Sequence, residues 1–294
     1  METGEPTYVP AGDLDGLSAG RTGGLRLAGL YVQGSLAALS GPTVAVVGTR
    51  APSDAGRRLA QRLAEGLGRA GICVISGLAL GIDSAAHRGA LAAGAPTIGV
   101  LGGGHACFYP SANRGLAETI VAGGGAVVSP FAPRHPARPA QFLQRNALIA
   151  ALADAVVVVE AAARSGSLNT AAWAADAGKP VMAFPGDVDR AKVAGCLALI
   201  RDGALLVRDI DDVVAALPSF GTIPAAITSR CAYEPQSELE RRLLRALHDA
   251  ECDVDALLAG IDHDPGHVLA ALADLELAGA IERRGGRSYA LAKA

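Results

Sequence analysis

Two glycine turns hold the residues whose types and spacing are best suited to bind a phosphate. Each turn follows an apolar strand, VAVVGTR at 44–50 and ICVISGLALGID at 72–83. At the carboxyl edge of a parallel α/β sheet, such turns let backbone N–H groups approach an anion. Neither turn has the GxGxxG or GxxxxGKS/T spacing, so we expect a ligand other than a dinucleotide or a P-loop nucleotide. The candidate residues are Gly48, Thr49, Arg50, Gly77 and Gly81.

Arg50 and Ser53 continue the first turn. The Arg50 guanidinium, at the end of a strand, could reach a phosphate that the backbone holds. An alternative is a salt bridge from Arg50 to Asp83 or Glu160 across the sheet edge. Ser53, in the run APSD, is the predicted N-cap of the next helix and is counted with the same site.

A stretch without acidic residues, 119–153, interleaves basic and aromatic side chains. Basic groups can neutralise a phosphate backbone while an aromatic face stacks on an unpaired base, as single-stranded nucleic acid requires. The open alternative is a proline-rich surface loop whose two phenylalanines pack inward. The side chains concerned are Arg134, His135, Arg138 and Arg145, with Phe131, Gln141, Phe142, Gln144 and Asn146 among them.

A third anion-binding turn follows the strand AVVVVE, which ends at Glu160. The next run, ARSGSLNTAAW, places small hydroxyl residues at another helix entrance on the same sheet edge. A serine nucleophile would need a base and an oxyanion hole, and the GxSxG spacing is absent, so we expect binding rather than catalysis. The candidate residues are Ser165, Gly166, Ser167 and Thr170.

Asp83 and His87 lie four residues apart on one predicted helical face. They are compatible with an acid-base pair or with half of a metal site, but no third ligand at helical spacing completes the latter. We favour a structural role, in which Asp83 holds turn backbone and His87 makes a partly buried polar contact. We therefore expect no catalytic residue, no metal and no cofactor.

These residues are positioned by an alternation of apolar strands and Ala/Leu/Arg helices. In residues 41–217 it predicts an α/β fold with a right-handed, doubly wound parallel sheet of six or seven strands. Within residues 1–40, LYVQGSLAALS predicts a short strand and turn against the sheet. A linker rich in Pro, Ser and Thr spans 218–236. Residues 237–294 have the pattern of a small C-terminal winged-helix domain, with three helices and a two-stranded wing.

Composition and charge are those of a soluble globular protein. Of 294 residues, 50% are hydrophobic and 19% charged. Because no apolar run spans a membrane and the amino end lacks a secretory layout, we expect a cytoplasmic protein. The net charge is -3, yet residues 41–217 hold 16 Lys or Arg against 13 Asp or Glu, so a polyanion would favour this segment. The five cysteines, never spaced as CxxC, are expected to be reduced and mostly buried.

The helix expected to contact DNA in the winged-helix domain, DPGHVLAALADLELAGA, has no Lys or Arg. An acidic helix enters a DNA major groove unfavourably. We therefore expect this domain to bind a partner protein or a second copy of the chain.

The order of these motifs resembles the DNA-processing protein A family, DprA, also called Smf. VAVVGTRAPSDAG at 44–56 resembles the family's strand, GSR turn and helix start, and SGLALGIDSAAHRGAL at 76–91 resembles its SGLA.GID..AH segment. FYP, QFLQRNALIAAL, SGSLNTA, FPGDV and GCLALIRDGA then follow in the family's order. The resemblance covers roughly residues 28–214.

The resemblance implies an extended Rossmann-like domain that binds single-stranded DNA without catalysis. It also implies protection of DNA during natural transformation, loading of the recombinase RecA with displacement of single-strand-binding protein, and a homodimer. By motif position, Arg50 with Gly48 would form the phosphate pocket, and Phe142, Arg145 and Asn146 would line the path of the strand. The edge would be completed by Ser165, Gly166, Ser167 and Thr170.

Three features depart from the family pattern. The family's FxRRNR run is FLQRNA here, with Gln144 and Ala147 in place of arginines, so the groove has fewer positive contacts unless Arg134 and Arg138 compensate. Leu197 stands where the family has an asparagine. The SAM-like helical domain of many relatives has almost no room before residue 28, so we expect residues 1–40 to be an extension without it.

Two other functions stay open on the sequence. The cytokinin-activating phosphoribohydrolases have a similar sheet with an SGG-type turn, although their PGGxGTxxE run is absent here. Such a nucleotide-processing enzyme would use Glu160 or Asp83 at the pocket. A scaffold that binds partners only through residues 218–294 is the other hypothesis.

Overall fold

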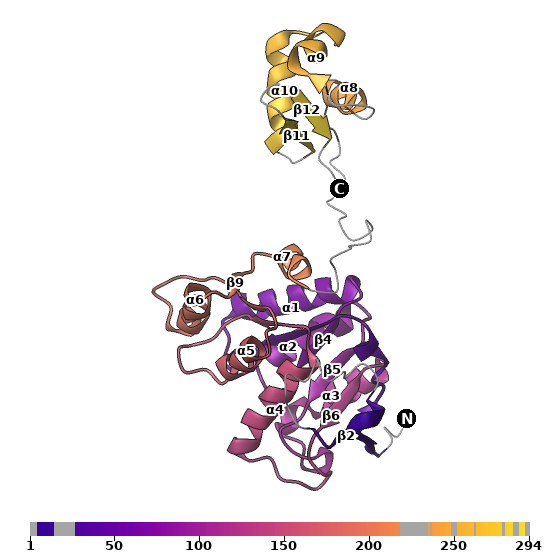
Figure 1. Cartoon of the computed structure of the whole chain (residues 1–294), viewed down its shortest axis with the longest axis vertical. Helices are drawn as coiled ribbons and strands as arrows, with labels where there is room; N and C mark the ends of the chain where they lie inside the picture. Colours follow the sequence, from indigo (N-terminus) through magenta and orange to yellow (C-terminus); the bar gives the residue numbers. More distant parts are fainter. Residues whose placement is uncertain are drawn as a thin grey trace. The chain divides into compact units, whose positions relative to one another are not determined.

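The computed structural model describes residues 5–14, 27–217, 235, 237–247, 252–261, 263–277, 280–284 and 288–291. The chain forms two compact units, Met1–Thr222 and Ile223–Ala294 (Figure 1). The division lies inside the predicted linker 218–236, most of which is outside the described residues. The exact boundaries between the predicted domains stay a prediction.

The first unit is built on one nine-stranded sheet. In chain order its strands are β1 Thr7–Pro10, β2 Gly29–Gly34, β3 Thr43–Val47, β4 Cys73–Ser76, β5 Thr97–Val100, β6 Ala126–Ser129, β7 Ala155–Val158, β8 Val181–Ala183 and β9 Leu205–Leu206. The spatial order is β1-β2-β6-β5-β4-β3-β7-β8-β9. The seven strands from β6 to β9 pair in parallel, and β1 and β2 are antiparallel at one edge.

The predicted doubly wound parallel sheet is confirmed. Strands β3 to β7 are buried along their whole length, because helices cover both faces, and this explains their continuous apolar runs. The strand predicted from LYVQGSLAALS is β2, which pairs with β6. Strand β1 was not predicted, since the short polar-flanked run TYVP carries no alternation that marks a strand.

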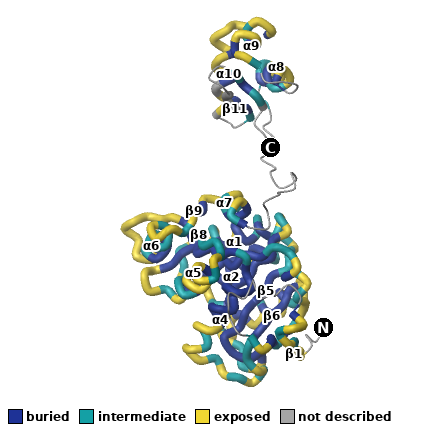
Figure 2. Tube along the Cα trace, viewed as in Figure 1, coloured by how far each residue is buried: buried dark blue, intermediate teal, exposed yellow. Residues whose placement is uncertain are grey.

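Helices cover both faces of this sheet (Figures 1 and 2). They are α1 Asp54–Arg69, α2 Ile82–Ala92, α3 Arg114–Ala122, α4 Pro139–Leu152, α5 Ser167–Asp176, α6 Ala194–Arg201 and α7 Ile210–Ala215, with 3-10 turns η1 Ala11–Asp13, η2 Ala37–Ser40, η3 His105–Cys107, η4 Ser111–Asn113 and η5 Ala191–Val193. Alternate side chains of β3 face the two layers. Val44 and Val46 share a core with α1, α2 and α7, whereas Ala45 and Val47 share one with α4, α5 and α6.

The sheet order brings the predicted turns together. Strands β4, β3 and β7 are neighbours, so the turns that follow them lie side by side at their carboxyl ends. These turns lead into α2, α1 and α5, respectively. The main chain links the turn after β3 to both of the others, because Thr49 N–H donates to Glu160 O at 2.7 Å and Ile82 N–H donates to Thr49 O at 3.2 Å.

The second unit contains α8 Glu238–Ala246, β10 Cys252–Asp253, α9 Val254–Gly260, α10 Pro265–Leu277, β11 Ile281–Arg284 and β12 Ser288–Leu291. Its sheet has the order β10-β12-β11. Leu243, Leu257, Leu272 and Tyr289 belong to its separate core. The three predicted helices and the antiparallel wing are confirmed, and β10 adds a short third strand. The tip of the wing lies outside the described residues.

Four of the five cysteines fall in the described residues, and none of these four forms a disulfide. Cys73 and Cys196 are buried, and burial raises the pKa of Cys73 to about 12 and that of Cys196 to about 11. Cys107 and Cys252 are only partly buried, so the expectation of mostly buried thiols holds for two of the four. None of the described helices combines the length and apolarity that a membrane span requires.

Candidate functional site

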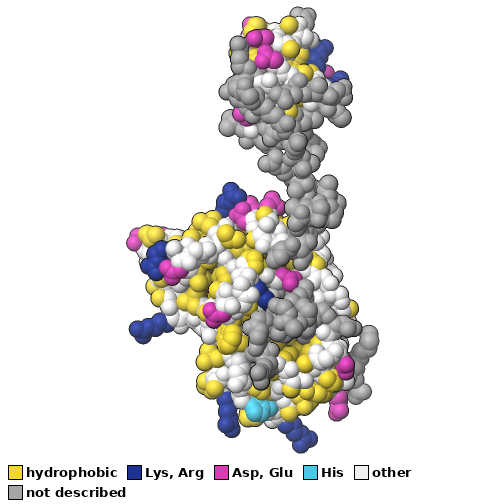
Figure 3. Space-filling model, viewed as in Figure 1, with side chains coloured by type: hydrophobic (Ala, Val, Ile, Leu, Met, Phe, Trp, Pro, Cys, Tyr) yellow, Lys and Arg dark blue, Asp and Glu magenta, His cyan; other side chains and the backbone are white. Residues whose placement is uncertain are grey.

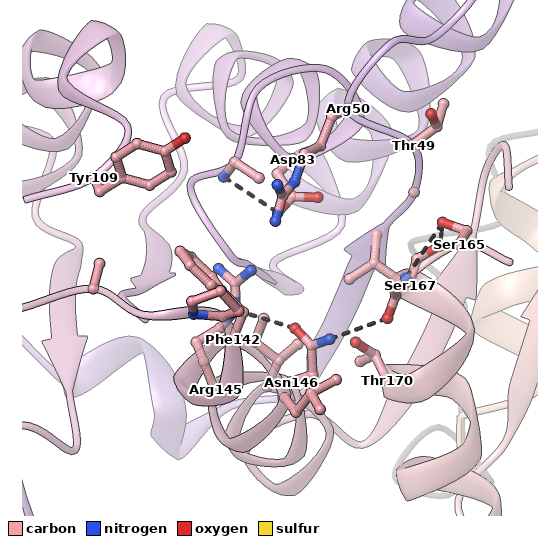
Figure 4. A pocket seen from close by; sticks show the side chains of 18 residues that line it. Thr49, Arg50, Asp83, Tyr109, Phe142, Arg145, Asn146, Ser165, Ser167 and Thr170 are labelled. Atoms are coloured by element: carbon pink, nitrogen blue, oxygen red, sulfur yellow. Dashed lines mark hydrogen bonds between the residues drawn. The ribbon is translucent and has the colours of Figure 1, made fainter. Parts of the chain in front are cut away.

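A cavity of about 640 Å³ opens at the carboxyl ends of β3, β4 and β7 (Figure 4). Its lining comes from the turns after β3, β4 and β7, from Asp83 on α2, from α4, and from Tyr109 on the loop after β5. Sequence reasoning named no role for Tyr109, and only the aromatic run FYP marked its position. The predicted residues that line the cavity are Gly48, Thr49, Arg50, Phe142, Arg145, Asn146, Ser165, Gly166, Ser167 and Thr170.

Five predicted residues do not line this cavity. Ser53 caps α1 as predicted, since its Oγ accepts from Gly56 N–H at 3.0 Å. Gly77 borders a smaller adjacent hollow of about 40 Å³. Gly81 has a φ of +87° and stands against the main chain of Thr49 and Arg50, so only glycine suits this position. The exposed Arg134 and Arg138 lie on the loop before α4.

Arg50 is the exposed cation of the cavity. Its guanidinium carbon lies 5.5 Å from the centroid of the Phe142 ring, within the range of a cation–π contact. Within the described part of the chain, no ion pair joins Arg50 to Asp83 or Glu160, so the salt-bridge alternative is wrong. Glu160 instead lies 3.7 Å from Arg190. The donors of Arg50 are therefore available to an anion.

Arg145 lies beneath the same ring and is only 5% exposed. Its guanidinium carbon is 5.6 Å from the Phe142 centroid, but its N–H groups donate to Gly77 O, to Val100 O at 3.1 Å and to Asn146 Oδ1 at 3.1 Å. Burial lowers the pKa of Arg145, and the nearby Asp83 carboxylate opposes that change. The sequence placed Arg145 along the path of a ligand. The structure engages its Nε and Nη1 at the floor of the cavity, and its Nη2 makes no hydrogen bond within the described residues.

The side-chain amide of Asn146 is also engaged in hydrogen bonds within the protein. Its Oδ1 accepts from Arg145, and its Nδ2 donates to Gly166 O at 3.0 Å. The residue is 8% exposed and ties α4 to the turn before α5. Asn146 therefore positions the third turn, while its amide has few hydrogen-bonding sites left for a ligand.

The turn after β7 presents the beginning of α5 to the cavity. Ser165 Oγ and Ser167 Oγ are 2.8 Å apart, and Ser167 N–H donates to Ser165 Oγ at 3.4 Å. Ser167 and Thr170 are buried on the inner side of the helix. Figure 4 shows these side chains across the cavity from Tyr109 and Phe142. A positive helix end and an aromatic ring thus face the same space.

The basic and aromatic segment divides into two parts. Phe142 lies on α4 and makes an edge contact with Tyr109, with centroids 6.0 Å apart. Phe131 stacks on His135 at 5.1 Å, away from the residues that line the cavity. Of the two phenylalanines, Phe142 therefore lines the cavity and Phe131 packs within the loop before α4.

The three residues that depart from the family pattern lie in different environments. Gln144 is exposed and Ala147 is buried, and neither lines the cavity. Ala147 is 4% exposed, and the expectation of fewer positive groove contacts stays a prediction. Leu197 is half-buried on α6.

Asp83 and His87 have the predicted structural roles. Asp83 Oδ2 accepts from Gly77 N–H at 3.1 Å and from Ala79 N–H at 3.3 Å. Burial raises the pKa of Asp83, against the opposing effects of Arg145 and these N–H groups. His87 Nδ1 lies 2.9 Å from Thr97 Oγ1, and burial lowers the pKa of His87 to about 3, so the ring is neutral. Over the described residues, no group of three His, Cys, Asp or Glu is arranged to hold a metal ion.

Comparisons with known proteins agree on one family. Residues 27–218 match the family described as DNA recombination-mediator protein A, and residues 229–287 match the DprA winged helix domain. The chain is 43% identical over 247 residues to the putative DNA processing protein DprA of Mycobacterium tuberculosis. The match covers 83% of this chain and 63% of that protein, so the chain spans less than two thirds of this relative's length.

Two solved structures share the fold. The X-ray structure of DNA processing protein A from Streptococcus pneumoniae has a TM-score of 0.67 and 37% identity, over 74% of this chain and 76% of that one. DNA processing protein A from Helicobacter pylori, whose structure is described for its single-stranded DNA binding mode, has a TM-score of 0.61 and 26% identity. That match covers 71% of this chain and 93% of the other.

Proposed function

The chain belongs to the DNA-processing protein A family, DprA or Smf, and we propose that it binds single-stranded DNA in the cavity at the β3, β4 and β7 edge. The observation that carries the proposal is the exposed Arg50 guanidinium, 5.5 Å from the Phe142 ring at the mouth of the cavity. Arg50 contacts a phosphodiester, and Phe142 stacks on an unpaired base. In a duplex the faces of the bases are stacked on one another and are not accessible to the Phe142 ring.

The geometry favours binding over chemistry. Neither carboxylate that a nucleotide hydrolase would use is free in the cavity, because Asp83 accepts from two turn N–H groups and the buried Glu160 does not line the cavity. A general base needs a free lone pair directed at its substrate. We therefore propose that the protein acts as a recombination mediator without catalysis, and the phosphoribohydrolase hypothesis is the second candidate only because the fold is similar.

The finer role is also a proposal. We propose that the protein protects single-stranded DNA during natural transformation and helps to load RecA, displacing single-strand-binding protein. The exposed edge strand β9, with Leu205 at 50% and Leu206 at 45% exposure, supports a homodimer. Figure 3 shows hydrophobic side chains gathered over α5, α6 and β9 on the face in view.

A fluorescence titration tests the proposed function. We expect labelled oligo-dT to bind at least tenfold tighter than a duplex of equal length, because only the single strand exposes bases to Phe142. Equal affinity for the duplex would contradict the stacking role. Incubation with AMP tests the second candidate. If the protein releases adenine from AMP and does not bind oligo-dT, the mediator proposal is wrong and the hydrolase function is supported.

A further inference from the structure

Glu160 places a carboxylate at the first turn of α1. The residue follows β7 and is only 2% exposed. Its Oε2 accepts from Ser53 N–H at 3.0 Å and from Ser53 Oγ–H at 2.9 Å. Gly56, on the first turn of α1, is so close that a Cβ there would overlap with Glu160 Oε2. The helix start is therefore shaped around this side chain.

This position is where nucleotides bind in many doubly wound sheets. The turn after a central strand and the start of the next helix offer N–H donors and a positive helix end to a phosphate. Here the N–H groups of Ser53 and Gly56 already have internal acceptors. Ser53 donates to Glu160, and Gly56 N–H donates to Ser53 Oγ at 3.0 Å. The protein's own anion occupies the place of a phosphate.

The second carboxylate oxygen shows that this arrangement is not optimal for stability. Glu160 Oε1 is buried and has no hydrogen-bond partner among the described residues. Its nearest cation is Arg190, whose Nη2 lies 3.7 Å away on a side chain that is 44% exposed. A buried carboxylate with an unsatisfied oxygen costs folding free energy that a neutral side chain would avoid. Its negative charge therefore calls for a functional explanation.

We propose that Glu160 determines the specificity of the site by excluding free nucleotides and terminal phosphates. A phosphate monoester at the start of α1 would carry up to two negative charges next to the Glu160 carboxylate, and like charges repel strongly where water is scarce. An internal phosphodiester carries one charge and binds at Arg50, on the exposed side of the same turn. Because of Glu160, this Rossmann-like site binds the DNA strand but has little affinity for free nucleotides. The inference rests on the proposed DNA binding.

Isothermal titration of the full chain with AMP, with inorganic phosphate and with oligo-dT tests the proposal. Glu160→Gln keeps the volume and an acceptor for Ser53 but removes the charge. We expect AMP and phosphate to bind this variant at least tenfold tighter than the wild type, with oligo-dT affinity changed by less than threefold. Glu160→Asp, which keeps the charge, should exclude AMP as the wild type does. Glu118→Gln, on the exposed face of α3, is the matched charge control.

The outcomes separate this inference from the proposed function. Equal affinity of the wild type and Glu160→Gln for AMP and phosphate, with oligo-dT binding intact, overturns the role of Glu160 alone. A wild type that does not bind oligo-dT overturns the proposed function first. Thermal denaturation confirms that each variant is folded, and Glu160→Met provides a second neutral side chain of similar length if the glutamine variant is unstable.

Discussion

Two arginines lie beside the same aromatic ring, and the protein uses them in opposite ways. Arg50 is exposed, and no carboxylate at the sheet edge pairs with it in the described structure. Arg145, at nearly the same distance from Phe142, donates to three acceptors of the protein and faces the buried Asp83. The comparison teaches that a charge near a ligand site is available only when its donors lack internal acceptors. The mouth of the cavity therefore offers donors to a ligand, and its floor supports the fold.

The largest effect is expected at the floor. Arg145→Ala leaves the carbonyls of Gly77 and Val100 without this donor and removes the positive charge near the buried Asp83. Each buried acceptor left unsatisfied costs about 1 to 3 kcal/mol, so we expect the free energy of unfolding to fall by about 2 to 6 kcal/mol in a urea titration. Normal stability together with lost DNA binding would instead make Arg145 a ligand contact.

At the mouth of the cavity, Arg50→Ala should change binding without changing stability. Loss of a charge-assisted contact of about 1.5 to 3 kcal/mol lowers oligo-dT affinity roughly tenfold to a hundredfold. The free energy of unfolding should move by less than about 0.5 kcal/mol, since the side chain is exposed. Arg88→Ala, an exposed arginine on α2, is the control with the same charge change and should bind normally in fluorescence anisotropy. A stability loss at Arg50 as large as that at Arg145 would remove the distinction between mouth and floor.

Phe142 contacts both arginines, so its substitution should affect both DNA binding at the mouth of the cavity and packing at its floor. Phe142→Ala removes a stacking surface worth about 1 to 3 kcal/mol per base, so oligo-dT affinity should fall at least about fivefold. Phe142→Tyr keeps the ring and should bind within about twofold of the wild type. If both variants lose affinity equally, the ring acts through packing and not through a base.

The smallest effects are expected on the loop before α4. Arg134→Ala and Arg138→Ala remove exposed charges outside the cavity, so each should weaken oligo-dT binding by about threefold or less. These effects should disappear at high salt, because exposed charges are screened. An effect as large as that of Arg50→Ala, persisting in salt, would extend the binding surface onto this loop.

The sheet could be predicted from the sequence because the features that mark its strands and turns are local in the chain. Buried strands appear as continuous apolar runs, and the turns between strands and helices carry glycine and N-cap residues such as Ser53. The parallel order of β4, β3 and β7 then follows from right-handed crossovers and places the three turns together. Both the cavity and Arg50 at its mouth could be derived in this way.

What the sequence could not show depends on contacts between distant segments. Arg145 is basic and sits in a basic run, but its acceptors Gly77 O and Val100 O lie 68 and 45 residues away in the chain. The contact between Ser53 and Glu160 spans 107 residues. Local periodicity does not indicate which donor bonds to which acceptor. The difference in exposure between Arg50 and Arg145 therefore becomes visible only once the fold is known.

The salt dependence of oligo-dT affinity for the wild type, Arg50→Ala and Arg88→Ala tests the central claim most directly. If Arg50 contacts a phosphate of the strand, the slope of log affinity against log salt should be shallower by about 0.7 in Arg50→Ala and unchanged in Arg88→Ala. The same slope in all three proteins would contradict the assignment of Arg50 as the phosphate contact of the cavity.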